Sequence, residues 1–145
     1  MAVDVPQLLE LSVPELEEVF RSSTAGPIPA GEADGTVLVP PGSRLEGPAS
    51  KVIHFLVWRG KVFDPESGEL KNRIGPLGLH LVAAKVYKDA SWFDQKETIV
   101  LDYSQTSLVA HWIRDEIRLV GPGVYLGLVF WEHAKILHFA LKFPS

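Results

Sequence analysis

Short runs of alternating hydrophobic and polar residues, separated by glycine, proline and other turn-forming residues, extend over most of the chain. A period of two places the apolar side chains on one face of a β-strand. The pattern predicts strands at residues 36–39, 61–64, 69–74, 79–88, 97–103, 108–120, 123–131 and 135–143. About eight strands with short connections indicate a mainly β protein, an antiparallel meander that closes into a barrel because closure removes exposed edges.

The beginning of the chain follows a helical pattern instead. Residues 5–23 are predicted to be helical, with residues 6–11 as a separate turn, because Ser12 and Glu15 have the spacing of a capping box. Apolar residues then recur at helical spacings of three or four: Val13, Leu16, Val19 and Phe20. We therefore expect one domain over residues 1–145, with a helical segment and loop at 1–34 and a barrel at 35–145.

Residues 47–60 fit two interpretations. The apolar residues at 52, 55 and 56 suit a helix, whereas the continuous run from His54 to Trp58 suits a strand. Pro48 and Ser50 are typical of a helix start, so we favour a short second helix at this position.

The predicted strand 123–131 is apolar on both faces. A strand of an antiparallel sheet with one face in water should alternate between apolar and polar residues. Another element must therefore cover its outer face. The N-terminal helix is the nearest candidate, and a homodimer interface is the second.

Composition and charge narrow the class of partner. The chain has 14 Lys and Arg against 18 Asp and Glu, and its net charge of −4 argues against nucleic acid or an anionic membrane. Cysteine is absent, which excludes disulfides and thiolate chemistry and agrees with a reducing cytoplasm. Because the N-terminus lacks the features of a signal peptide and no apolar run reaches the ~20 residues of a membrane-spanning helix, we expect a cytoplasmic protein.

The most informative face belongs to the predicted strand 108–120. Two ionisable residues lie there among aliphatic ones, in the order Val109, His111, Ile113, Asp115, Ile117 and Leu119. The opposite face carries Arg114, Glu116 and Arg118, and burying three charges is unfavourable. We therefore predict that His111 and Asp115 point into the barrel. Separated by four residues of strand, they lie about 13 Å apart, so each needs a partner from another strand.

Neighbouring strands add polar and aromatic side chains to the candidate cavity. The predicted ligand-binding residues are His111, Asp115, Ile113, Lys85, Tyr87, Tyr103, Tyr125 and His138. The candidates for acid–base catalysis are Asp115, His111 and Tyr125. For the tyrosines, a hydroxyl that simply reaches the barrel rim is an equally ordinary outcome.

No metal or cofactor is predicted. The five histidines lack H-x-H and H-x-x-x-H spacing, and the sequence has no G-x-S-x-G, phosphate-loop or dinucleotide motif. A centre built from histidines of separate strands, or haem held by one axial histidine, stays open as an alternative.

Several segments resemble known proteins: Trp58 to Phe63, Leu70 to Arg73, and Ile113 to Glu116 together with Tyr125-Leu126-Gly127. The chain resembles small lipocalin-like (calycin-type) barrels, and more narrowly the uncharacterised bacterial proteins of the GXWXG type. Trp58 and Gly60 match the second half of that block, and Leu56 stands in place of its first glycine. The resemblance implies a ligand-holding barrel and no particular reaction.

Polar residues inside an otherwise apolar barrel favour binding of a small, mostly hydrophobic molecule. A cofactor-independent isomerase, cyclase or lyase is the alternative. It requires Asp115 or His111 within hydrogen-bond reach of a second polar group, with a shifted pKa. A homodimeric interaction module is a further alternative, and it requires the outer face of strand 123–131 to be uncovered.

Overall fold

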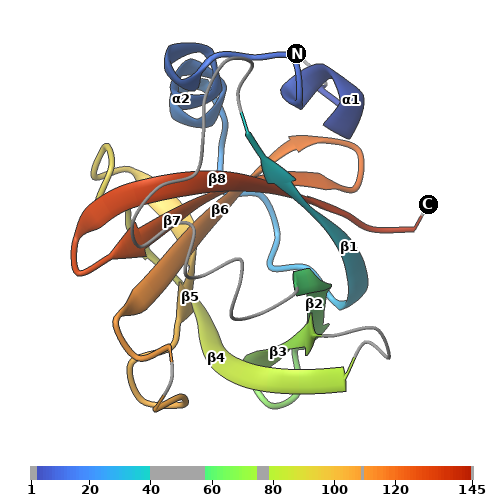
Figure 1. Ribbon diagram of the computed structural model, residues 1–145, viewed down its shortest axis with the longest axis vertical. Coiled ribbons are helices and arrows are strands. Elements are labelled where there is room, and N and C mark those ends of the chain that lie inside the picture. The colour runs from blue at the N-terminus through green and yellow to red at the C-terminus, as the bar shows by residue number, and fades with distance from the viewer. Residues whose placement is uncertain (1–2, 40–57, 75–78, 109, 145) are drawn as a thin grey trace.

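The computed structural model describes residues 3–39, 58–74, 79–108 and 110–144, and of residues 79–81 only the backbone. In this part of the chain, eight antiparallel strands close into a barrel in chain order, with β1 paired to β8 (Figure 1). The strands are β1 Gly31–Leu38, β2 Trp58–Asp64, β3 Glu69–Ile74, β4 Leu79–Ala90, β5 Glu97–Asp102, β6 Ile113–Gly121, β7 Val124–Trp131 and β8 Ala134–Lys142. The predicted fold class, a closed antiparallel meander, is confirmed.

The first two strands differ from the prediction. Strand β1 begins at Gly31, inside the predicted loop, because residues 31–34 pair with β2. The helix predicted at 47–60 lies mostly outside the described residues. Its last residues, 58–60, form the start of β2 instead, since Trp58 pairs with Ile74 of β3.

Two helices precede the barrel and lie outside it (Figure 1). They are α1 (Val5–Leu8) and α2 (Val13–Ser22), which confirms the predicted separation into a short turn and a longer helix. At the start of α2, the Ser12 hydroxyl accepts from the Glu15 amide and the Glu15 carboxylate accepts from the Ser12 amide. None of the helices in the described ranges is long and apolar enough to span a membrane.

The outer face of β7 is covered by these helices. Leu8 of α1 and Leu16 and Phe20 of α2 are fully buried. They belong to one apolar cluster with the outward-facing side chains of β7: Val124, Leu126, Leu128 and Phe130. The helices therefore provide the cover that the two-sided apolar strand requires. The uncovered β7 face on which the interaction-module alternative depends is not found in the described structure.

The outer face of β6 departs from the prediction. Arg114, Glu116 and Arg118 point outward as predicted, but Glu116 and Arg118 have no exposed surface. Each is paired: Arg118 with Asp94, and Glu116 with Arg114. The argument that charges keep this face in water was wrong, because α2 and the β4–β5 connection supply partners for them.

Strand β6 begins at Ile113, not at residue 108. The preceding residues form turns, in which the Ile113 amide donates to the Ala110 carbonyl at 2.9 Å. His111 lies in this turn region, with Nδ1 2.8 Å from the Leu108 carbonyl oxygen. It therefore does not share a strand face with Asp115, which corrects the prediction. No glycine or proline occurs at residues 104–112, so the sequence has no signal that ends the alternation there.

Candidate functional site

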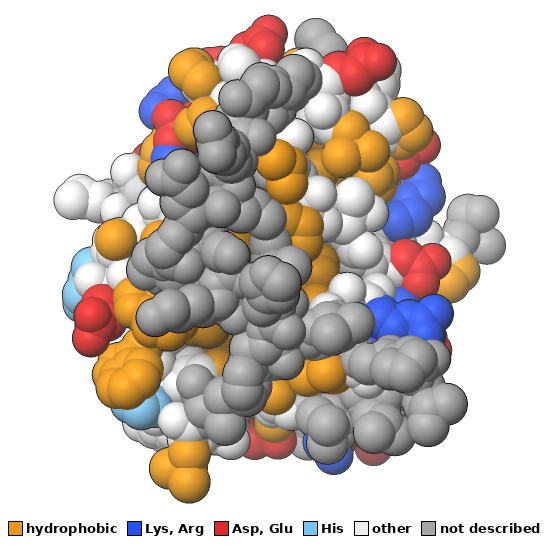
Figure 2. All heavy atoms as spheres, in the orientation of Figure 1, with side chains coloured by type: hydrophobic (Ala, Val, Ile, Leu, Met, Phe, Trp, Pro, Cys, Tyr) orange, Lys and Arg blue, Asp and Glu red, His pale blue; other side chains and the backbone are white. Residues whose placement is uncertain are grey.

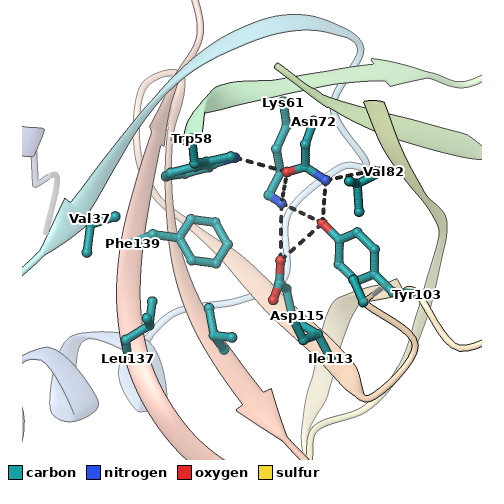
Figure 3. Close-up of a pocket in the computed structure, with 12 residues that line it drawn as sticks. Val37, Trp58, Lys61, Asn72, Val82, Tyr103, Ile113, Asp115, Leu137 and Phe139 are labelled. Atoms are coloured by element: carbon teal, nitrogen blue, oxygen red, sulfur yellow. Dashed lines mark hydrogen bonds and ion pairs between the residues drawn. The ribbon is translucent and has the colours of Figure 1, made fainter. Parts of the chain in front are cut away.

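A cluster of four buried polar residues lies inside the barrel (Figure 3). We call Lys61, Asn72, Tyr103 and Asp115 the Lys61 cluster. Their exposed fractions are 3%, 2%, 3% and 4%, respectively. Lys61, Asn72 and Asp115 come from β2, β3 and β6, and Tyr103 directly follows β5, so barrel closure is what brings the four residues together.

The strand register explains why these side chains meet. Lys61 and Asn72 are directly opposite each other on β2 and β3, and their side chains therefore project from the same face. Asp115 is opposite Leu101 of β5. Tyr103 follows Leu101 by two residues and so points to the same side of the sheet. Both pairs face the barrel interior.

Lys61 directs its ammonium group at three oxygen atoms. The distances from Nζ are 2.7 Å to Asn72 Oδ1, 2.7 Å to the Tyr103 hydroxyl and 3.1 Å to Asp115 Oδ2. An ammonium group has three N–H donors and no acceptor. All three donors of Lys61 therefore have a partner within the protein.

Asn72 connects the cluster to the barrel wall. Its Nδ2 donates to the Val82 carbonyl and to the Tyr103 hydroxyl, both at 2.8 Å. Its Oδ1 accepts from the Trp58 indole at 2.9 Å in addition to Lys61. These bonds fix the orientation of the amide and leave it no free donor.

Asp115 has two carboxylate oxygens in different situations. Oδ2 faces Lys61 and also lies 3.5 Å from the Tyr103 hydroxyl, the distance of a long hydrogen bond. Oδ1 is buried and has no hydrogen-bond donor among the described residues. A buried acceptor without a partner costs about 1–3 kcal/mol.

The electrostatics of the cluster follow from burial and pairing. Burial alone lowers the pKa of the Lys61 ammonium, but Tyr103 and Asp115 outweigh it, so the pKa lies above its usual value. Burial raises the pKa of the Asp115 carboxyl, and the Lys61 charge opposes that shift. Burial also raises the pKa of the Tyr103 hydroxyl. Because three oxygens surround Nζ, Lys61 is a full ammonium, and the Asp115 carboxylate balances its charge.

A cavity opens beside the cluster, and its other walls are apolar. They are formed by Val37, Trp58, Val82, Ala110, Ile113, Val129, Leu137 and Phe139. The cavity has a volume of about 50 Å³ and is partly open to solvent. This space admits a few waters, and a larger ligand would extend through the open side.

Two glycines make room for the aromatic walls. A Cβ at Gly35 would lie 2.3 Å from the Trp58 ring, and one at Gly127 would lie 2.2 Å from the Phe139 ring. The two rings meet edge to face with centroids 5.4 Å apart. The Lys61 Nζ lies 5.4 Å from the centroid of each ring, where its charge is attracted to the aromatic faces.

The predicted site residues are divided between the cavity and other places. Asp115, Tyr103 and Ile113 line the cavity. Lys85 and Tyr87 lie on the outer face of β4, since Val86 between them packs against the core inside the barrel. The Tyr87 hydroxyl donates to Asp102 at 2.9 Å. This placement separates Lys85 and Tyr87 from the cavity.

Tyr125, His138 and His111 also lie away from the cavity. The Tyr125 hydroxyl donates to the Pro27 carbonyl at 2.8 Å. His138 is opposite Leu128, on the outer face of β8, where burial lowers its pKa to about 4. His111 packs on the Trp112 ring in the turn before β6.

Sequence reasoning missed Lys61, Asn72 and the contact made by Trp58. A signal was available: with a period of two, Lys61 shares a face with Phe63, and Asn72 shares one with Leu70. Both apolar neighbours are buried. In such short, charge-rich strands the alternation alone does not show which face is inside.

The part of the chain that the structure describes contains no group of three or more His, Cys, Asp or Glu residues placed to hold a metal ion. The cluster itself has one carboxylate, and that carboxylate is paired with Lys61. The chemistry that it can perform is hydrogen bonding and proton transfer.

A crystal structure of a protein from Thermomonospora curvata is similar to this chain, with a TM-score of 0.66 over 94% of this chain and 90% of that chain. The sequence identity is 16%, so the likeness shows the fold alone. No protein-family model and no curated protein matches the sequence. The likeness thus supports the eight-strand barrel, and function has to be inferred from the geometry of the site.

Proposed function

We propose that this barrel binds a small, mostly hydrophobic molecule in its interior cavity, as a lipocalin-like protein does. The apolar walls would bury the body of the ligand, and the Lys61 cluster would fix its orientation. Ligand pockets commonly combine apolar walls with a few polar groups in this way.

The observation that carries the proposal is Asp115 Oδ1. A protein interior normally satisfies its buried polar atoms, and an exception calls for an explanation. This atom belongs to a side chain that lines the cavity and has no donor among the described residues. A bound molecule that donates to Oδ1 would remove the penalty.

A second candidate is a cofactor-independent acid–base enzyme that uses the same cavity. It is favoured by the contact of Asp115 with two other polar groups, Lys61 and Tyr103, at 3.1 and 3.5 Å. The raised pKa of Asp115, caused by burial, would suit a general base. Asp115 would then take a proton from the substrate, and Lys61 would stabilise the resulting negative charge.

The proposed partner is a small molecule and not a nucleic acid. On the face shown in Figure 2, Lys and Arg side chains are interspersed with Asp and Glu and do not form a basic patch. The absence of cysteine is the reason to propose the cytoplasm. A homodimer remains a prediction, to be tested by the dependence of molecular mass on concentration.

A ligand screen by thermal shift and native mass spectrometry tests the proposed function, using neutral apolar compounds of one or two rings. Val129→Phe, in the cavity wall, should abolish the binding of every compound found. Val13→Phe, at a position on α2 that is 37% exposed, is the control. Ligands that bind equally well to Val129→Phe would place binding elsewhere and refute the proposal. A chromogenic proton-transfer substrate that turns over in the wild type but not in Asp115→Asn would favour the enzyme.

A further inference from the structure

The inference below rests on the proposed function and narrows the class of ligand. We infer that the ligand is an uncharged molecule whose hydroxyl or N–H group donates a hydrogen bond to Asp115 Oδ1. Ligands that carry only acceptors, such as ketones, ethers and esters, and ligands that carry a carboxylate are disfavoured at this site.

Every donor of the cluster is already used. The three N–H groups of Lys61 and both N–H groups of Asn72 have acceptors within the protein. The Trp58 indole donates to Asn72 Oδ1. The Tyr103 hydroxyl accepts from Lys61 and Asn72, so its proton is directed at Asp115 Oδ2. A ligand acceptor would therefore have to displace a hydrogen bond that exists.

The hydrogen-bonding group of the cluster that has no partner is an acceptor. Figure 3 shows Lys61 and Tyr103 meeting one oxygen of the Asp115 carboxylate, while the other oxygen carries no bond. That atom, Oδ1, is buried, and the described residues offer it no donor. A donor from the ligand would gain a hydrogen bond to a charged group, and the cluster would lose none.

The charges of the cluster favour a neutral ligand. Lys61 and Asp115 form an ion pair at 3.1 Å whose side chains are 4% and 5% exposed, so the pair has no net charge. A ligand carboxylate at Oδ1 would face the negative charge of Asp115 without access to a free N–H. A ligand ammonium would bring a second cation near Lys61. Either would bury a charge that the protein does not balance.

Cyclic probes of matched size test the inference in the wild-type protein. The dissociation constants of cyclohexanol, cyclohexanone, cyclohexanecarboxylate and cyclohexylammonium are measured by NMR titration. Cyclohexanol should bind at least about 10-fold more tightly than each of the others, since a hydrogen bond to a charged group has roughly that effect. Equal affinities for the alcohol and the ketone, or tightest binding by the carboxylate or the ammonium, would overturn the inference.

Asp115→Asn supplies a sharper test. Lys61 and Tyr103 donate toward Oδ2, so the amide oxygen should take that position and the NH₂ group should replace Oδ1. The acceptor then becomes a donor, and the variant should prefer cyclohexanone over cyclohexanol. Asp94→Asn, at a partly buried carboxyl outside the barrel, is the matched control and should keep the wild-type preference.

The outcomes separate the inference from the proposed function. Both neutral probes could bind with equal affinity, and Val129→Phe could abolish the binding of both. That result would support the cavity as a ligand site and overturn the inference. If no probe binds the wild type and no compound of the wider screen does, both fail. If Asp115→Asn does not fold, the wild-type preference alone decides the inference.

Discussion

The protein contains two buried ion pairs of similar chemistry and different surroundings. Lys61 and Asp115 lie inside the barrel, whereas Arg118 and Asp94 lie outside it, beneath α2. Lys61 is 4% exposed at its side chain and Arg118 has no exposed side-chain surface. Burial therefore does not distinguish the two pairs. The two pairs differ in the number of buried hydrogen-bonding atoms that have no partner.

Arg118 is completely satisfied. Its five N–H groups have acceptors: both oxygens of Asp94, at 2.6 and 2.7 Å, and the carbonyl groups of Phe20, Lys96 and Glu97. The carbonyl of Phe20 belongs to α2, and the other two lie at the β4–β5 connection. This pair therefore joins the helix to the barrel.

The inner pair has an acceptor without a donor among the described residues, Asp115 Oδ1, and the Asp115 side chain lines a cavity. A saturated buried pair fulfils a structural role, and an incompletely saturated pair beside empty space is suited to binding. Substitutions in the two pairs, and at charged residues elsewhere, test this distinction.

Arg118→Leu should have the largest effect on stability, a loss of about 4 kcal/mol in the free energy of unfolding. It removes the closest charge partner of Asp94 and one hydrogen bond from each of three backbone carbonyls, of which those of Phe20 and Lys96 keep the amides of Ser23 and Ser91 as donors. The double variant Arg118→Leu/Asp94→Leu should recover only part of the loss, because the hydrogen bonds from the guanidinium to the three carbonyls are missing in both variants. Urea unfolding measures both losses. Full recovery in the double variant would show that the backbone contacts contribute nothing.

Lys61→Met should destabilise the protein by about 3 kcal/mol, since it leaves the Asp115 carboxylate unpaired in the interior. Because the adjacent cavity is partly open to solvent, hydration of the carboxylate should moderate the loss. In contrast to the outer pair, Lys61→Met/Asp115→Leu should recover most of the stability, because Asn72 and Tyr103 keep each other as partners. Urea unfolding and a double-mutant cycle provide the comparison. A double variant as unstable as Lys61→Met would contradict this account.

His138 allows a test by pH, because it is buried and its Nε2 has no partner among the described residues. Burial and the nearby Lys135 charge depress its pKa to about 4. The stability that neutral His138 contributes is therefore present above its unfolded pKa of about 6.5 and is lost as the pH falls toward 4.

The wild type should lose roughly 2 to 3 kcal/mol over that pH range through this residue, as measured by urea unfolding at a series of pH values. His138→Leu should be less sensitive to acid by that amount. His133→Leu, in the exposed turn between β7 and β8, is the matched control. An unchanged acid sensitivity in His138→Leu would assign the loss to other groups.

Glu18→Gln should have the smallest effect, below about 0.5 kcal/mol. Glu18 pairs with Arg21 at 2.8 Å, but both side chains are largely exposed to water. Chemical denaturation of this variant gives the baseline for charge removal. A loss comparable to that of Lys61→Met would show that burial is not what makes the inner pair strong.

Local patterns in the sequence were enough to predict the barrel. Alternation gave most of the strands, and the capping box at Ser12 marked the start of α2. The apolar residues on both faces of strand 123–131 correctly predicted that another element packs on its outer face. Asp115 lies inside the barrel as predicted, although the reason for that prediction was wrong, because Glu116 and Arg118 on the opposite face are buried as well.

The site could not be predicted fully, because its residues contact residues that are distant in the sequence. Glu116 and Arg118 are buried because Ser91, Asp94 and α2 reach them, and no local pattern shows that. The Lys61 cluster likewise depends on register: Lys61 and Asn72 meet only when β2 and β3 pair as they do. His111 was misplaced because the alternation continues through a turn.

A high-resolution crystal structure of the wild-type protein, purified without added ligand, tests the central claim most directly. The claim is that Asp115 Oδ1 is an acceptor kept free for a ligand. The account predicts electron density for a ligand donor or an ordered water within about 3.2 Å of Oδ1, in a cavity between Trp58, Val129 and Phe139. A collapsed cavity in which a donor from the protein satisfies Oδ1 would contradict it.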